Sequence, residues 1–147
     1  MIAGIGFDIC EIQRVERAAA KAAFLTRVFS PCEQNIWRMR GENPAFLAGC
    51  FAGKEAVAKA LGTGFVGFWP SDIEILRNKQ GKPFVRLSGA ALTLSRGLCI
   101  SKWHISITNT ADFAAAVVVA TSIYLSARPI SNVVTRHLQH LKSSRGG

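Results

Sequence analysis

The feature that most constrains the fold is a long apolar segment with a helix start before it and a helix stop after it. Asn43 can cap a helix, and Pro44 suits its first turn. Residues 46–61 are small or apolar apart from three charged side chains, and Gly62 then provides a C-terminal stop. We therefore predict a long helix over residues 46–61.

The N-terminus has the pattern of a strand. Over residues 1–10, Ile5, Phe7 and Ile9 alternate with smaller or polar residues. A period of two places Asp8 on the face opposite those three hydrophobic side chains. We expect Asp8 to stand near the end of this strand.

Two further helical segments are expected between this strand and the long helix. Residues 11–24 have helical spacing, with Ile12, Val15 and Ala19 on the inner face and basic residues outside. A second helix starts at residues 30–33, where a serine cap, a proline and a glutamate form a capping box. The first third of the chain is thus one strand and a helical block.

The remainder is predicted to be mostly strands. Apolar or alternating segments are expected at residues 72–77, 83–87, 103–108 and 113–120. The first two are joined by a turn at 78–82, and Ser88 starts a short helix through Arg96. This order favours an α+β fold with α/β layers.

Size and composition favour a single compact domain in the cytoplasm. A chain of 147 residues can bury a core, and 49% hydrophobic with 18% charged residues excludes disorder throughout. The longest apolar stretch, residues 114–125, is shorter than the about 20 residues that cross a bilayer. Asp8 and Glu11 stand where a signal peptide would be basic. We expect no membrane contact.

The four cysteines do not indicate a metal site. They are widely spaced and form no C-x-x-C pair: Cys10, Cys32, Cys50 and Cys99. The histidines have no recognised metal-binding spacing with them. We interpret the cysteines as buried free thiols.

The net charge of +9 favours a polyanionic partner. Residues 126–147 contain four basic residues and no acidic one, which leaves +5 on the preceding residues. We therefore divide the chain into a domain, 1–125, and a basic C-terminal extension, 126–147. Two interpretations of the extension stay open, disorder or a weak amphipathic helix with Val133, Val134, His137, Leu138 and Leu141 on its apolar side.

Three residues together indicate phosphate chemistry. Glu55 and Lys59 are four residues apart on the predicted long helix, a spacing that alone is typical of a surface ion pair. Asp8 alone is typical of an acid that meets solvent or caps a helix. Combined, Asp8 and Glu55 could hold one Mg²⁺, which prefers one or two carboxylates, waters and diphosphate oxygens. Lys59 would place a positive charge near the same phosphates.

Five short motifs in register resemble one known family. They begin at residues 4–9 and continue at 51–64, 72–75, 81–83 and 104–108. This set is similar to the holo-acyl-carrier-protein synthases, small phosphopantetheinyl transferases of fatty acid biosynthesis, and the likeness covers residues 1–124. The resemblance implies a small, mostly antiparallel sheet packed against a long helix, in a 4′-phosphopantetheinyl transferase-like fold. It also implies a homotrimer with active sites between subunits.

The resemblance assigns roles to individual residues. Asp8 and Glu55 would bind Mg²⁺, and Glu55 and Lys59 would be catalytic. The residues expected to bind coenzyme A are Lys54, Lys59, Gly62, Gly64, Asn109 and Thr110. The acidic acyl carrier protein would meet Arg14, Lys21 and Arg27, whose charge would steer it into place.

The implied reaction is an in-line attack of a carrier serine on the β-phosphate of coenzyme A, which releases adenosine 3′,5′-bisphosphate. The general base stays open between Glu55, Lys59 and a metal-bound water. Two other interpretations compete: a non-catalytic trimeric scaffold, or a basic nucleic-acid-binding protein. The second is disfavoured because the basic residues are dispersed and no nucleic-acid-binding motif is present.

Three positions depart from the family pattern. Many members have arginine where this chain has Cys50, serine at Ala58 and histidine at Asn109. The arginine and histidine resemble contacts to the nucleotide phosphates. Their absence removes charge-assisted hydrogen bonds of roughly 1.5–3 kcal/mol each. Either coenzyme A binds weakly, or a basic residue elsewhere compensates.

Overall fold

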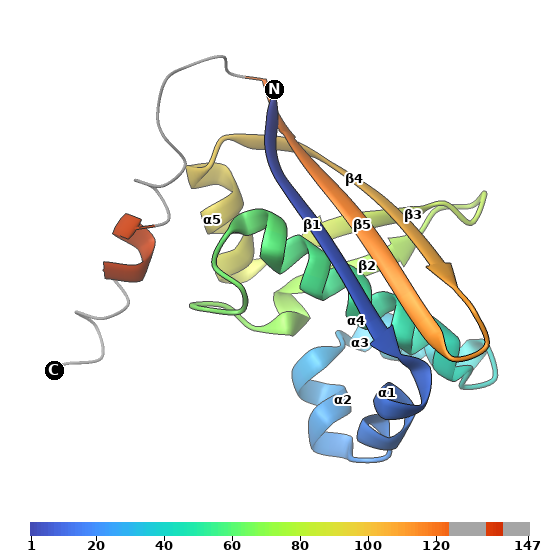
Figure 1. The fold of residues 1–147 in the computed structure, drawn as a ribbon. Coiled ribbons are helices and arrows are strands. Elements are labelled where there is room, and N and C mark those ends of the chain that lie inside the picture. The colour runs from blue at the N-terminus through green and yellow to red at the C-terminus, as the bar shows by residue number, and fades with distance from the viewer. Residues whose placement is uncertain (124–134, 140–147) are drawn as a thin grey trace, which may run out of the picture.

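The computed structural model describes residues 1–123 and 135–139 and has an α+β fold, as predicted (Figure 1). Its elements in chain order are β1 (Ile2–Glu11), α1 (Ile12–Ala19), α2 (Ala22–Val28), α3 (Pro31–Met39), α4 (Pro44–Leu61), the 3₁₀ turn η1 (Pro70–Asp72), β2 (Ile73–Arg77), β3 (Pro83–Leu87), α5 (Gly89–Gly97), β4 (Ile100–Asn109) and β5 (Phe113–Ser122). The predicted long helix is α4, which begins at Pro44 with Asn43 as its cap and is followed by Gly62.

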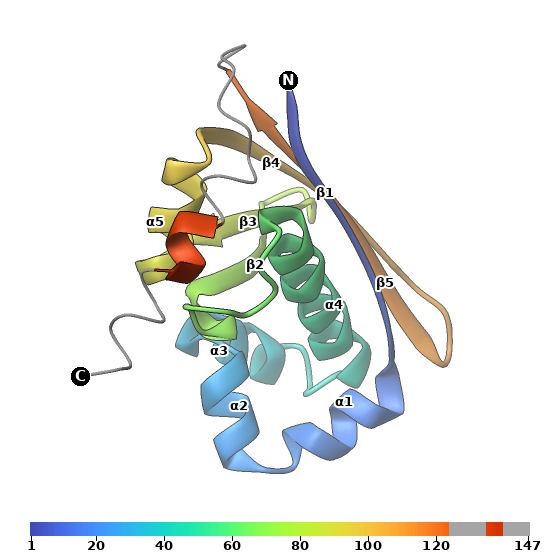
Figure 2. The same ribbon diagram turned by 60° about the vertical axis from the view of Figure 1, so that its left-hand side comes forward.

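The strands form two antiparallel sheets. One has the order β1-β5-β4, and the other is the hairpin of β2 and β3. Helix α4 lies across one face of the three-stranded sheet (Figures 1 and 2). In the register of that sheet, Asp8 of β1 is opposite Ala116 of β5, and Ala116 is also paired with Ile107 of β4.

Two glycines allow β1 to lie directly on α4. A Cβ atom at Gly4 would overlap the carbonyl oxygen of Ala60, and one at Gly6 would overlap the carbonyl oxygen of Ala56. Any larger residue would push the strand and the helix apart. This close backbone approach fixes which residues of α4 lie beside the end of β1.

The opposite face of the sheet is apolar and exposed in the single chain. Ile5 is 62% exposed, Phe7 58% and Ile9 56%. Val117, the register partner of Phe7, continues this surface on β5 and is 41% exposed. As the alternation predicts, the Asp8 side chain lies on the other face and is only 16% exposed. We call Ile5, Phe7, Ile9 and Val117 the outer sheet face.

A buried ion pair connects α3 and α4. Lys54 Nζ lies 2.7 Å from Glu33 Oε2, and both side chains are fully buried. The ammonium also donates to the carbonyl oxygens of Pro70, at 3.2 Å, and Ile73. The other Glu33 oxygen accepts from the Ile75 backbone N–H at 2.9 Å. The predicted capping glutamate thus also ties α3 to α4 and β2.

The helix predicted over 11–24 is wrong in one respect: it is interrupted after Ala19. Lys21 has an extended backbone and precedes a second helix, α2, that runs to Val28. The change of direction brings Phe24 against Phe51 of α4, with ring centroids 6.3 Å apart. Burial of apolar surface from α2 therefore overrides the continuous helical pattern.

The expectation that Ser88 starts a helix is confirmed only in part. Ser88 precedes α5 as predicted, but its hydroxyl donates to the Asp72 carbonyl at 3.4 Å and makes no cap hydrogen bond.

In the C-terminal extension, residues 135–139 are helical, and the rest of 126–147, with Val133, Val134 and Leu141, lies outside the described residues. Among the described helices, none is long and apolar enough to span a membrane.

Candidate active site

The centre of the candidate site is an ion pair between β1 and α4. Lys59 Nζ donates to Asp8 Oδ1 at 2.8 Å and to the Phe7 carbonyl oxygen at 2.9 Å. The Lys59 side chain is half exposed, so its ammonium stays open to solvent and ligands. The structure thus brings together two residues that are 51 positions apart in the sequence.

Glu55 is the second carboxylate of this cluster and stands one helical turn before Lys59. Partial burial raises the pKa of Glu55, the negative charge of Asp8 raises it further, and Lys59 opposes the change. Two carboxylates that repel each other across a partly buried site favour a cation between them.

This donor set fits Mg²⁺. Within the part of the chain that the structure describes, no group of three or more histidine, cysteine or acidic side chains is placed to hold a metal. For an ion at this site, Asp8 and Glu55 would be the two protein carboxylates. Mg²⁺ commonly accepts such a site and completes its octahedron with water and phosphate oxygens.

Cys10 borders the cluster and was not among the predicted site residues. Its Sγ donates to the Ala48 carbonyl oxygen at 3.3 Å. Burial, and next the charge of Asp8, raise the pKa of Cys10 to about 11, so it is a thiol at neutral pH. A thiol is a poor nucleophile. The period-two pattern that directs Asp8 toward α4 could have identified Cys10, because both share one strand face.

Lys54 does not join the cluster, although coenzyme A binding was predicted for it. Its ammonium is fully buried and contacts Glu33 and two backbone carbonyls. With no exposed surface it cannot reach a ligand in this structure, so we correct its role to a structural one.

The remaining residues predicted to bind coenzyme A lie in two turns. Gly62 has the left-handed conformation that ends α4, with φ 81°, and Gly64 follows with φ 59°. Asn109 ends β4, and Thr110 starts the turn to β5, where its Oγ1 accepts from the Phe113 backbone N–H at 3.1 Å. Asn109 and Thr110 are exposed and can donate neutral hydrogen bonds.

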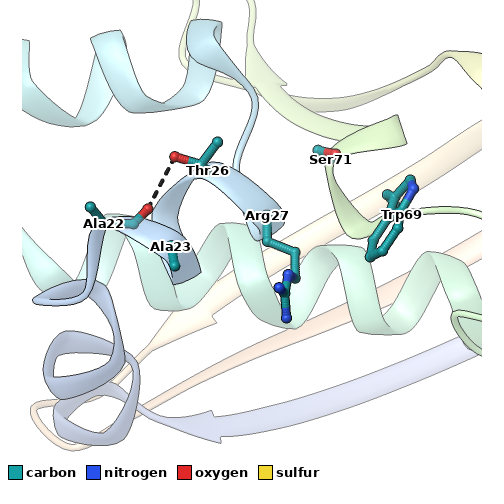
Figure 3. Close-up of a pocket in the computed structure, with 6 residues that line it drawn as sticks. All are labelled: Ala22, Ala23, Thr26, Arg27, Trp69 and Ser71. Atoms are coloured by element: carbon teal, nitrogen blue, oxygen red, sulfur yellow. Dashed lines mark hydrogen bonds between the residues drawn. The ribbon is translucent and has the colours of Figure 1, made fainter.

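The predicted carrier-binding residues lie on the first two helices. Arg14 on α1, Lys21 between the helices and Arg27 on α2 are all exposed. Arg27 also lines a shallow groove between α2 and η1, together with Trp69 and Ser71 (Figure 3). Trp69 is 62% exposed, which gives this groove an accessible apolar surface beside a positive charge.

Comparison with known protein families places the chain in one superfamily. A sequence model of the 4′-phosphopantetheinyl transferase superfamily matches residues 4–118, which include the whole Asp8, Glu55 and Lys59 cluster. The chain therefore belongs to the 4′-phosphopantetheinyl transferase superfamily.

Individual relatives show which group of proteins within this superfamily the chain resembles. The chain is 43% identical over 122 residues to the holo-[acyl-carrier-protein] synthase of Alkaliphilus metalliredigens, which covers 82% of this chain and 100% of the relative. It is 44% identical over 126 residues to the synthase of Clostridium beijerinckii, across 84% of this chain and 100% of that protein. Within the superfamily it groups with the holo-[acyl-carrier-protein] synthases, as the sequence motifs predicted.

Solved structures show the same fold. The synthase of Neisseria meningitidis superposes with a TM-score of 0.76 at 36% identity, over 83% of this chain and 100% of that one. The Helicobacter pylori synthase, solved in complex with coenzyme A, superposes with a TM-score of 0.69 at 35% identity, over 80% of this chain and 99% of that one. The predicted sheet packed against one long helix is confirmed.

Proposed function

We propose that this chain transfers the 4′-phosphopantetheine group of coenzyme A to a serine of apo-acyl carrier protein, in support of fatty acid biosynthesis. Asp8, Glu55 and Lys59 form the site of that transfer. The observation that carries the proposal is the convergence of these three side chains where β1 crosses α4, with Lys59 Nζ 2.8 Å from Asp8.

Each residue has a distinct task. Asp8 and Glu55 would hold Mg²⁺, which when bound neutralises charge on a diphosphate. Lys59 would orient the same phosphates through its exposed ammonium and offset negative charge in the transition state. Positioning and charge neutralisation supply most of the catalysis in phosphoryl-type transfer, and these are the two tasks assigned to Asp8, Glu55 and Lys59.

The two substrates would approach from different elements. Gly62, Gly64, Asn109 and Thr110 are the proposed contacts to coenzyme A, all in turns next to the ends of α4 and β4. The carrier would meet Arg14, Lys21 and Arg27, whose exposed positive charges suit an acidic protein.

The functional assembly is a homotrimer with active sites between subunits. The outer sheet face supports this proposal, because Ile5, Phe7 and Ile9 form an exposed apolar row that a second copy could bury. We also propose a cytoplasmic location. Four free cysteines, Cys10, Cys32, Cys50 and Cys99, fit a reducing compartment.

The direct test is to incubate the protein with Mg²⁺, coenzyme A and apo-carrier and to weigh the carrier by mass spectrometry. One phosphopantetheine arm adds about 340 Da. We expect Asp8→Ala and Glu55→Ala to abolish this gain while the protein stays folded. Glu16→Gln, a change at an exposed acid of α1, is the matched control. Normal transfer by either alanine variant would refute the assigned site, and no transfer by the unaltered chain would favour a non-catalytic scaffold.

A further inference from the structure

Lys59 is held by β1 and not by its acidic neighbour on the same helix. Its ammonium donates to Asp8 Oδ1 at 2.8 Å and to the Phe7 carbonyl oxygen at 2.9 Å. Glu55, one helical turn before Lys59, has the spacing of an ion-pair partner. Among residues 1–123 and 135–139, however, no ion pair joins Glu55 to Lys59. The ammonium therefore reaches across to the strand and occupies one oxygen of Asp8.

The Asp8 carboxylate is also the group that a divalent ion would need. It is only 16% exposed, so few positions next to its oxygens are open. An ion bound to Asp8 Oδ1 at the usual Mg²⁺ distance of about 2.1 Å would lie within about 5 Å of the Lys59 ammonium as it stands. Two cations so close together in a partly buried site repel each other.

We propose that the Lys59 ammonium competes with the divalent ion for Asp8 and turns from β1 to the phosphates of coenzyme A when the ion is bound. This inference rests on the proposed function, which supplies the ion and the phosphates. The Lys59 side chain is 50% exposed, so its flexible four-carbon stem can swing without disturbing the core. Lys59 is thus a tethered counter-ion in one arrangement and a phosphate ligand in the other.

The charges of the cluster favour this exchange. Asp8, Glu55 and one ammonium together carry one net negative charge. Burial raises the pKa of Glu55 and the charge of Asp8 raises it further, so a nearby cation stabilises the two charged carboxylates. With a divalent ion as well, the cluster has one net positive charge. Asp8 then no longer needs the ammonium, which can pair with a diphosphate instead.

The first test measures Mn²⁺ binding to the full chain without coenzyme A, from the electron paramagnetic resonance signal of the free ion. We expect Lys59→Met to lower the Kd for Mn²⁺ about tenfold or more, because the competing cation is gone. Lys59→Arg keeps the charge and should keep a Kd close to that of the unaltered chain. The control is Lys79→Met, at an exposed lysine in the turn between β2 and β3. It should change the Kd by less than about twofold, since exposed distant charges are screened.

The second test follows the release of Lys59 directly. The unaltered chain is acetylated with acetic anhydride, with and without Mg²⁺, and each lysine is read by mass spectrometry. An amino group that leaves Asp8 and Phe7 becomes accessible to the reagent. We therefore expect Mg²⁺ to increase the labelling of Lys59 several-fold relative to that of Lys79. In Asp8→Ala the labelling of Lys59 should be raised already without Mg²⁺ and should not respond to the ion.

Each outcome decides a separate question. If Lys59→Met binds Mn²⁺ no more tightly than the unaltered chain, or if Lys79→Met gains as much, the ammonium does not compete for Asp8 and the inference is wrong. Should Lys59→Met unfold, the labelling of the unaltered chain decides, and labelling of Lys59 that Mg²⁺ leaves unchanged overturns the inference. Failure of phosphopantetheine transfer while the competition is measured would instead refute only the proposed function.

Discussion

The ammonium group of Lys59 on α4 lies 2.8 Å from the carboxylate of Asp8 on β1. This contact depends on backbone packing, because β1 reaches α4 only where glycines replace larger residues. The position of the candidate site is therefore set by the same close approach that builds the core.

Gly6→Ala tests this dependence. The added Cβ would overlap the Ala56 carbonyl oxygen, so β1 must move away from α4 and carry Asp8 with it. We expect transfer activity to fall at least tenfold (about 1.4 kcal/mol in the barrier), with a lower melting temperature. Gly49→Ala is the control, because its Cβ would meet only the Ile107 side chain at 3.2 Å, which can shift. Equal effects in the two variants would contradict the role of Gly6.

The second prediction concerns the contribution of the buried Lys54–Glu33 ion pair to stability. Lys54→Met leaves the Glu33 carboxylate buried without its cation, which costs about 3–5 kcal/mol of the free energy of unfolding. Adding Glu33→Gln removes that charge and keeps a side-chain oxygen for the Ile75 backbone N–H. The double variant should therefore be more stable than Lys54→Met alone, as measured by urea denaturation. A loss below about 1 kcal/mol in Lys54→Met would show that the pair is not important for stability.

Thiol reactivity provides a third prediction. Burial raises the pKa of Cys10 to about 11 and that of Cys50 to about 12. Cys32 and Cys99 are exposed, so the expectation that all four cysteines are buried is wrong for these two. At pH 8 only about one Cys10 side chain in a thousand is a thiolate, the reactive form. A thiol reagent at pH 8 should label Cys32 and Cys99 in the folded protein and all four cysteines after denaturation. Rapid labelling of Cys10 would contradict the packing at the end of β1.

Local sequence patterns were sufficient to predict β1 and α4, the two elements that carry the residues of the site. The alternation around Asp8 predicted both β1 and the side to which Asp8 points, because a strand has a fixed period. Asn43 and Gly62 marked the boundaries of α4, because a cap and a left-handed glycine act within one helical turn. These features depend on neighbouring residues only.

Features that depend on long-range packing could not be predicted. Nothing within 11–24 shows the break after Ala19, which follows from the contact of Phe24 with Phe51. Lys54 was predicted to bind coenzyme A because the sequence does not show its ion-pair partner. That partner, Glu33, is 21 residues away and was predicted only to take part in a capping box.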